Sequence, residues 1–268
     1  MYATNYHRAS SVDEAVKLLS DADEGKYVSG GMTLIATMKQ RLASPSDLVD
    51  LRHIPSLKGI RVDGRRVTIG AATTHAEVAS SAAIRSVCPA LCELAGMIGD
   101  PHVRHMGTIG GSVANNDPAA DYPSAMLALN ATIVTDRRQI AAEDFFEGLF
   151  ETALKGGELI TAVTFEAPEK AGYAKFPNPA SRYAMTGVFV AKMKDAHPSL
   201  RKVVAAGALG EFPLVCLSAS LAYFDSYRMA LGTANLIQGQ RDFFGAHGFE
   251  LTDRPGEQHG KWPATIQH

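Results

Sequence analysis

Two short segments join a Gly-Gly pair to nearby hydroxyl side chains, a combination suited to binding phosphate. The first reads SGGMTL over residues 29–34 and the second reads TIGGS over residues 108–112. Glycine lets the backbone adopt positive φ and lets a ligand approach closely, and successive N–H groups can then converge on an anion. One Gly-Gly pair is most often an ordinary turn. Two pairs, each beside hydroxyls, favour a site for the pyrophosphate of a dinucleotide.

The sequence around the two segments refines this hypothesis. A helix predicted to begin near Thr33 would place its N-terminus at the first segment, which favours an anion. Neither segment reads G-x-G-x-x-G, so a Rossmann fold is not indicated. A carboxylate beyond the second segment could accept hydrogen bonds from ribose hydroxyls. Asp117 and Asp121 are the carboxylates in this position; Asp117 precedes a proline and favours the start of a turn or helix.

The elements that must position these segments alternate between strand and helix. Ser11 and Glu14 have the spacing of a capping box at the start of a helix. Residues 26–51 form a predicted β–turn–α–β unit with parallel strands, and residues 59–74 form a predicted hairpin around Asp63-Gly64. The other expected elements are helices at 75–97 and 122–130, and strands at 131–136, 158–168, 172–176 and 184–193.

The composition sets broad limits on the function. The 268 residues carry a net charge of −2, with 46% hydrophobic and 20% charged residues, as in globular proteins. Such a length suggests about two domains, and the near-zero net charge argues against a nucleic-acid binder. The three cysteines are too few for a disulfide framework or a Cys₄ cluster, and Cys88 and Cys92 are expected to pack on one helix face. The chain shows neither a signal peptide nor an apolar membrane span, which predicts a cytoplasmic protein without a membrane span.

Several longer pieces of the sequence resemble one known family in order and spacing. They are SGGMTLIATMK, TIGAATTH, RHMGTIGGSVANNDPAADYPSAMLAL, GELITAVTFEAP and YAKFPNPASRYAMTGVFVA. The chain is similar over about residues 1–192 to the FAD-binding medium subunit of molybdenum hydroxylases, the carbon monoxide dehydrogenase and xanthine dehydrogenase group. The piece around the second Gly-Gly pair is the most specific.

The resemblance implies the fold and its domains. We expect an α+β protein with the vanillyl-alcohol-oxidase (PCMH-type) FAD-binding fold and a smaller C-terminal α+β domain. The FAD-binding domain would span residues 1–170, divided into an N-terminal lobe (1–55) and a central lobe (56–170). Residues 171–268 would form the C-terminal flavoprotein domain.

The resemblance also implies the residues that bind FAD. The pyrophosphate would lie on the two glycine segments, Asp121 on the adenosine side, Ile160 and Lys175 at the flavin ring or its edge, and Tyr183 near the isoalloxazine. The complete expected set is Ser29, Gly30, Gly31, Met32, Thr33, Leu34, Thr108, Ile109, Gly110, Gly111, Ser112, Asp121, Ile160, Lys175 and Tyr183.

The chain departs from the family pattern in two places. Met32 stands where a small or polar residue is usual. The sequence from about residue 197 onward does not match the family, and we expect its last 20 or so residues to be poorly ordered. Strong divergence or an altered reading frame would explain this tail.

The implied role is that of an electron carrier within a larger enzyme. The resemblance implies a partner large subunit with the molybdenum cofactor and a small subunit with [2Fe-2S] clusters, in a heterotrimer. FAD would take electrons from the clusters and pass them to NAD⁺, a quinone or oxygen, with no side chain acting as a catalytic nucleophile. Two alternatives are a stand-alone flavin reductase or oxidase of the same fold and a non-catalytic nucleotide-binding scaffold. His75, His102 and His105 are expected to be solvated or turn residues near Arg104, and Arg104 and His105 could support the second segment.

Overall fold

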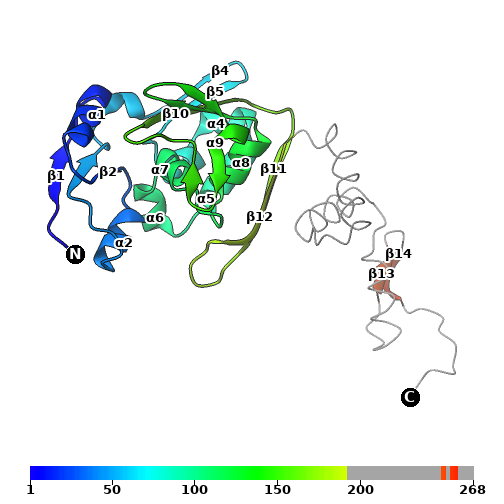
Figure 1. The fold of residues 1–268 in the computed structure, drawn as a ribbon. Helices are drawn as coiled ribbons and strands as arrows, with labels where there is room; N and C mark the ends of the chain where they lie inside the picture. Colours follow the sequence, from blue (N-terminus) through cyan, green and yellow to red (C-terminus); the bar gives the residue numbers. More distant parts are fainter. Residues whose placement is uncertain (192–248, 252–253, 259–268) are drawn as a thin grey trace, which may run out of the picture. The chain divides into compact units, whose positions relative to one another are not determined.

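The computed structural model describes residues 1–191, 249–251 and 254–258 (Figure 1). Contacts between residues divide the chain into two units, Met1–Lys194 and Asp195–His268. The described part of the second unit is the antiparallel pair β13 (Phe249–Leu251) and β14 (Arg254–Gln258). The rest of the predicted atypical tail, with its predicted poorly ordered end and Cys216, lies outside the described residues.

A three-stranded parallel sheet opens the first unit, in the order β1-β3-β2. Its elements are β1 (Asn5–Arg8), α1 (Val12–Ser20), β2 (Gly25–Val28), α2 (Leu34–Lys39) and β3 (Asp47–Asp50). The predicted β–turn–α–β unit with parallel pairing is confirmed. Ser11 caps α1 by accepting from the Glu14 N–H, but the Glu14 carboxylate bonds to Ser10 instead of completing the predicted box on Ser11.

An antiparallel five-stranded sheet follows, in the order β4-β5-β10-β6-β7. Its strands are β4 (Ile60–Asp63), β5 (Arg66–Gly70), β6 (Thr132–Thr135), β7 (Gln139–Ala141) and β10 (Ile160–Glu166), and the short helix η1 (Pro55–Leu57) precedes them. The predicted hairpin is confirmed. Gly64 occupies its turn with φ +57, a conformation that glycine adopts without steric cost.

Helices cover this sheet (Figure 1). They are α3 (His75–Ser80), α4 (Ala82–Val87), α5 (Pro89–Gly96), α7 (Ile109–Asn115), α8 (Tyr122–Ala128) and α9 (Ala142–Phe145), while α6 (Pro101–Met106) packs on α3 and buries none of its residues. The second glycine segment is not the turn that the sequence predicted. Gly110 and Gly111 lie in the first turn of α7, which Thr108 caps by accepting from the Gly111 N–H. Glycine is needed there because a Cβ at Gly110 would lie 2.5 Å from the Ala71 Cβ.

A large apolar cluster fills the space between the five-stranded sheet and these helices. Tyr122, Phe145 and Leu91 are completely buried in it, and such burial of large side chains dominates the stability of a domain. Cys88 and Cys92 are buried free thiols in the same cluster, so their predicted packing role is confirmed. The second glycine segment therefore begins a helix, α7, that packs into this cluster through Ile109 and Val113.

Two long antiparallel strands, β11 (Ala171–Pro177) and β12 (Ala184–Ala191), complete the described part of the first unit (Figure 1). A short pair, β8 (Phe146–Gly148) and β9 (Glu151–Thr152), precedes them. The assignment of residues 171–268 to a C-terminal flavoprotein domain stays a prediction. Among the described helices, none is both long and apolar enough to cross a membrane.

His75 differs from the prediction of a solvated or turn residue. It begins α3 inside a complete capping box between Thr74 and Glu77, and it is only 5% exposed. Burial, helped by the nearby Arg104 charge, lowers the pKa of His75 to about 4. His75 is therefore neutral at pH 7. His102 and His105 are exposed, as predicted, although they lie on α6.

We expect Gly110→Ala to destabilise the fold more than Gly111→Ala. The new methyl group at position 110 would overlap Ala71, a strain that typically costs about 1–3 kcal/mol. At position 111 the nearest atom is the Thr108 hydroxyl at 3.0 Å, and the better helix propensity of alanine offsets this contact by up to about 1 kcal/mol. Urea unfolding of both variants measures the difference, and equal losses would contradict the packing described here.

The stability of the protein should fall as the pH decreases from 6.5 to about 4. Unfolded His75 binds a proton near pH 6.5, but the folded state resists protonation until about pH 4. The stability that His75 contributes is thus complete above pH 6.5 and is lost across this interval, by about 3 kcal/mol. Urea unfolding of wild type and His75→Asn at several pH values isolates this contribution. Identical pH slopes in the two proteins would contradict a buried, neutral His75.

Candidate functional site

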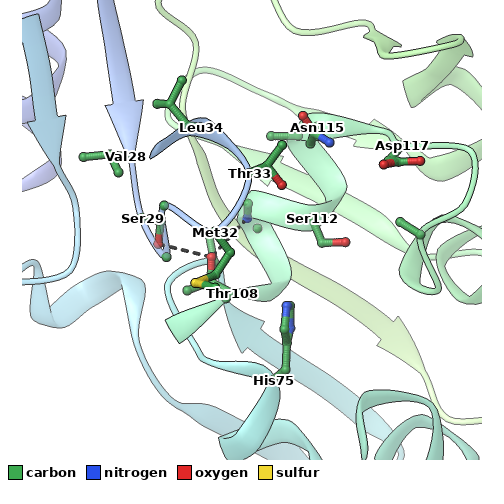
Figure 2. Close-up of a pocket in the computed structure, with 18 of the residues that line it drawn as sticks. Val28, Ser29, Met32, Thr33, Leu34, His75, Thr108, Ser112, Asn115 and Asp117 are labelled. Carbon is green, nitrogen blue, oxygen red and sulfur yellow. Dashed lines mark hydrogen bonds between the residues drawn. The ribbon is translucent and has the colours of Figure 1, made fainter. Parts of the chain in front are cut away.

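A pocket of about 680 Å³ lies within the first unit, where both glycine segments meet the loop between β11 and β12. Figure 2 shows Ser29, Met32 and Thr33 of the first segment beside Thr108 and Ser112 of the second, with the His75 ring below them. All but two of the predicted site residues line the pocket. The exceptions are Ile109 and Lys175, which are both buried beside it.

The first glycine segment offers a row of free hydrogen-bond donors. It connects β2 to α2, and Gly31 has φ +69, which permits the tight reversal. Within the part of the chain that the structure describes, no N–H from Ser29 to Leu34 has a protein acceptor. Unpaired N–H groups at a concave surface are costly unless a ligand or water accepts from them. Residues 29–34 therefore have the donor arrangement that an anion requires.

The second glycine segment contributes differently, because its first N–H groups are already bonded. Ile109 donates to the Thr73 carbonyl oxygen at 3.1 Å, and Gly110 donates to the Ala71 carbonyl oxygen at 2.9 Å. The Gly111 N–H donates to the hydroxyl of its cap, Thr108, at 3.2 Å. This segment thus brings its backbone surface and the Ser112 side chain to the pocket.

Direct contacts hold the two segments together. The Thr108 hydroxyl donates to the Ser29 hydroxyl oxygen at 3.1 Å, the bond drawn in Figure 2. Gly30 packs against the backbone of Met106 and Gly107, and a Cβ at Gly30 would lie 2.6 Å from the Gly107 Cα. The separation of the two segments is therefore set by backbone packing.

Asp121 lies at the pocket edge in a buried ion pair. Its two carboxylate oxygens accept from Lys175 Nζ at 2.9 and 3.0 Å, and the Tyr173 hydroxyl also donates to it. Lys175 Nζ donates in addition to the Met97 carbonyl oxygen at 3.1 Å. Burial and the neighbouring carboxylate raise the pKa of Tyr173, which stays un-ionised. This cluster fastens β11 to the start of α8.

The other predicted residues lie at different depths. Ile160 begins β10 and is nearly buried, whereas Tyr183 and Met32 are 44% and 40% exposed. Burial raises the pKa of Tyr183, and the Asp117 carboxylate raises it further. The Asp117 carboxylate accepts from the Ala119 N–H at 2.8 Å, which fits the predicted turn.

The sequence prediction omitted several residues that line the pocket. It also suggested that Arg104 and His105 support the second glycine segment. Arg104 donates to the carbonyl oxygens of Ile98 and Gly99, and His105 bonds within α6, so among the described residues neither shows a side-chain hydrogen bond to the second segment. Periodicity carries no signal for residues that reach a pocket from loops or strand ends. The missed lining residues include Lys26, Ala71, Ala72, His75, Gly107, Asn115 and Arg182.

Comparison with known proteins identifies the family of the first unit. The family "FAD binding domain in molybdopterin dehydrogenase" matches residues 2–167. The chain is 42% identical over 176 residues to the carbon monoxide dehydrogenase medium chain of Afipia carboxidovorans, covering 63% of this chain and 61% of that one. The crystal structure of carbon monoxide dehydrogenase from Hydrogenophaga pseudoflava matches with a TM-score of 0.67 at 36% identity, covering 69% of this chain and 68% of that chain.

A second family matches the later part of the chain. Residues 151–262 match the C-terminal domain of 6-phosphogluconate dehydrogenase. Over 108 residues the chain is 44% identical to a chloroplastic 6-phosphogluconate dehydrogenase of Arabidopsis thaliana, covering 40% of this chain and 22% of that protein. A shifted reading frame would not resemble another protein family, so the hypothesis of an altered frame is wrong.

The first match decides the classification. It covers more than half of the 268 residues, and the structure adopts the predicted α+β architecture with solved relatives of the same fold. The chain belongs to the family of FAD-binding domains of molybdopterin dehydrogenases, and its cofactor is FAD.

Proposed function

We propose that this chain is the FAD-carrying subunit of a multi-subunit molybdenum hydroxylase. Its role would be to accept electrons from [2Fe-2S] clusters on a small partner subunit and pass them to NAD⁺, a quinone or oxygen. The molybdenum cofactor would belong to a large partner subunit. Support comes from the relatives, which are named as the medium chain of carbon monoxide dehydrogenase and the medium subunit of nicotine 6-hydroxylase.

The observation that carries the proposal is the row of free N–H donors from Ser29 to Leu34. A pyrophosphate presents several acceptor oxygens and two negative charges, which such a row can satisfy. Within the described chain, the lysine and arginine side chains that line the pocket are Lys26 and Arg182, and both lie outside the glycine segments. The backbone would therefore be the main ligand of the pyrophosphate.

The remaining residues take roles that follow from their positions. Thr108 and Ser112 would complete the pyrophosphate site, while Ile160 and Tyr183 would contact the flavin. Asp121 would face the adenosine side from the pocket edge. Lys175, predicted at the flavin ring, bonds to that carboxylate and would instead hold it in place. Ile109 would support the site from the core. When bound, FAD supplies the ability to take electrons singly and release them in pairs.

The later part of the chain favours one alternative. Its similarity to a different dehydrogenase family means that residues beyond the first unit need not assemble as in the relatives. The chain would then be a nucleotide-binding protein that holds FAD without exchanging electrons in a complex. Co-expression with candidate cluster and molybdenum subunits separates the two functions, because only the first predicts a stable complex whose flavin is reduced on adding the complex's substrate.

The visible spectrum of the purified full-length chain tests FAD binding itself. We expect a yellow protein, or a colourless one that becomes yellow after incubation with FAD and gel filtration. Release of the flavin by heat should yield FAD and not FMN, since the pyrophosphate carries the binding. A colourless chain that FAD cannot reconstitute would contradict the proposal.

Gly31→Ala should weaken FAD binding at least tenfold, whereas Gly64→Ala should leave it unchanged. Both glycines have positive φ, +69 and +57, so alanine strains the backbone at each. Position 31 belongs to the proposed phosphate loop, and position 64 lies in the hairpin turn between β4 and β5. Fluorescence titration with FAD measures both dissociation constants. Equal affinities would show that the loop does not hold the cofactor.

A further inference from the structure

The His75 ring lies against the backbone of Gly107, which directly precedes the second glycine segment and also contacts the first. A Cβ built on Gly107 would be 2.6 Å from His75 Nε2 and 2.9 Å from His75 Cδ2, with the Val103 carbonyl oxygen at 3.1 Å. The backbone of Gly107 has φ −64 and ψ 144, which any residue can adopt. Glycine is therefore required at position 107 by the neighbouring imidazole and not by its own conformation.

Gly107 also lies close to the first glycine segment. Gly30 packs on the backbone of Met106 and Gly107 so closely that it too admits no Cβ. Gly107 thus packs closely against both Gly30 and the His75 ring. A shift of the ring would move Gly107 and, through it, Gly30.

The surrounding structure holds the ring in place. The backbone N–H of His75 donates to the Gly107 carbonyl oxygen at 3.0 Å, and an isolated bridge pairs Thr74 with Thr108. Behind the ring lies Tyr122, which is completely buried, with ring centroids 5.4 Å apart. The imidazole is therefore clamped between α8 and the second glycine segment.

Neither ring of this pair uses its hydrogen-bonding capacity within the described residues. His75 Nδ1 and the Tyr122 hydroxyl are buried without a partner. Unpaired buried polar groups are rare and call for a reason. A leucine or phenylalanine would fill a purely apolar position without this cost, and the close fit of the small imidazole against Gly107 agrees with the choice of histidine.

We propose that His75 is a positioning residue that sets the spacing between residues 29–34 and residues 108–112, and through that spacing the affinity for FAD. This role rests on the proposed FAD site. His75 acts through the shape of its neutral ring. The groups that face it are Arg104 from α6 and the un-ionised Tyr122 from α8.

The direct experiment adds a methyl group at position 107 of the full-length chain and, in a second variant, also removes the ring at position 75. We expect Gly107→Ala to raise the FAD dissociation constant at least tenfold, because the new methyl group displaces the ring. Removing the ring in His75→Ala/Gly107→Ala should recover at least a threefold gain in affinity over Gly107→Ala. Gly172→Ala, whose Cβ would have no neighbour within 4 Å, is the matched control and should bind as wild type does.

Two results would overturn the positioning role while leaving the FAD site intact. One is a double variant that binds FAD no better than Gly107→Ala, and the other is a Gly107→Ala variant that binds like Gly172→Ala. A wild-type chain that binds no FAD would instead overturn the proposed function, and the role of His75 with it.

A second measurement decides the question if Gly107→Ala fails to fold. His75→Asn leaves Gly107 unchanged but replaces the ring that packs against it. Its FAD affinity should therefore be several-fold weaker at pH 7.5. Between pH 7.5 and pH 5.5, the wild-type and His75→Asn affinities should change in parallel, because the buried ring stays neutral over this range. Diverging pH profiles over this range, or equal affinities at pH 7.5, would contradict the role.

Discussion

Close packing of backbone on backbone is the constraint on which the proposed site depends. Gly30 rests on Met106 and Gly107, and Gly107 rests on the His75 ring. These contacts bring together segments that are almost eighty residues apart and come from a parallel sheet and a helical layer. Each interface tolerates only hydrogen at the glycine Cα. The glycines near the pocket are thus needed as much to join two layers of the fold as to admit a ligand.

The two glycine segments differ in whether their backbone N–H groups are already hydrogen-bonded within the protein. The fold uses the first N–H groups of α7 to fasten that helix to the strand end at Ala71 and to Thr73. The N–H groups of residues 29–34 have no protein acceptor within the described residues. A rigid segment therefore lies beside a segment with free donors. This asymmetry matches a site in which one segment binds the anion and the other holds the first in position.

Local rules predicted most of the elements, because capping residues, turn glycines and apolar periodicity act over a few residues. The helix at Val12–Ser20, the hairpin at Gly64 and the parallel unit around β2 and β3 all follow from such signals. The same rules placed Gly110 and Gly111 in a turn, because the contact with Ala71 that makes glycine favourable inside a helix is not local. They also left His75 in solvent. Its burial depends on Tyr122 and Gly107, which only the tertiary structure brings to it. The family resemblance located the pocket residues well, but it could not reveal which of them bind a ligand and which support others.

Amide hydrogen exchange of the full-length chain, resolved to single residues by NMR, tests the central claim most directly. Addition of FAD to the cofactor-free protein should slow exchange strongly at residues 29–34, whose N–H groups gain acceptors. Residues 109–111 should change little, since their N–H groups already donate within the protein. Protection confined to residues 109–111, with none at residues 29–34, would contradict the account.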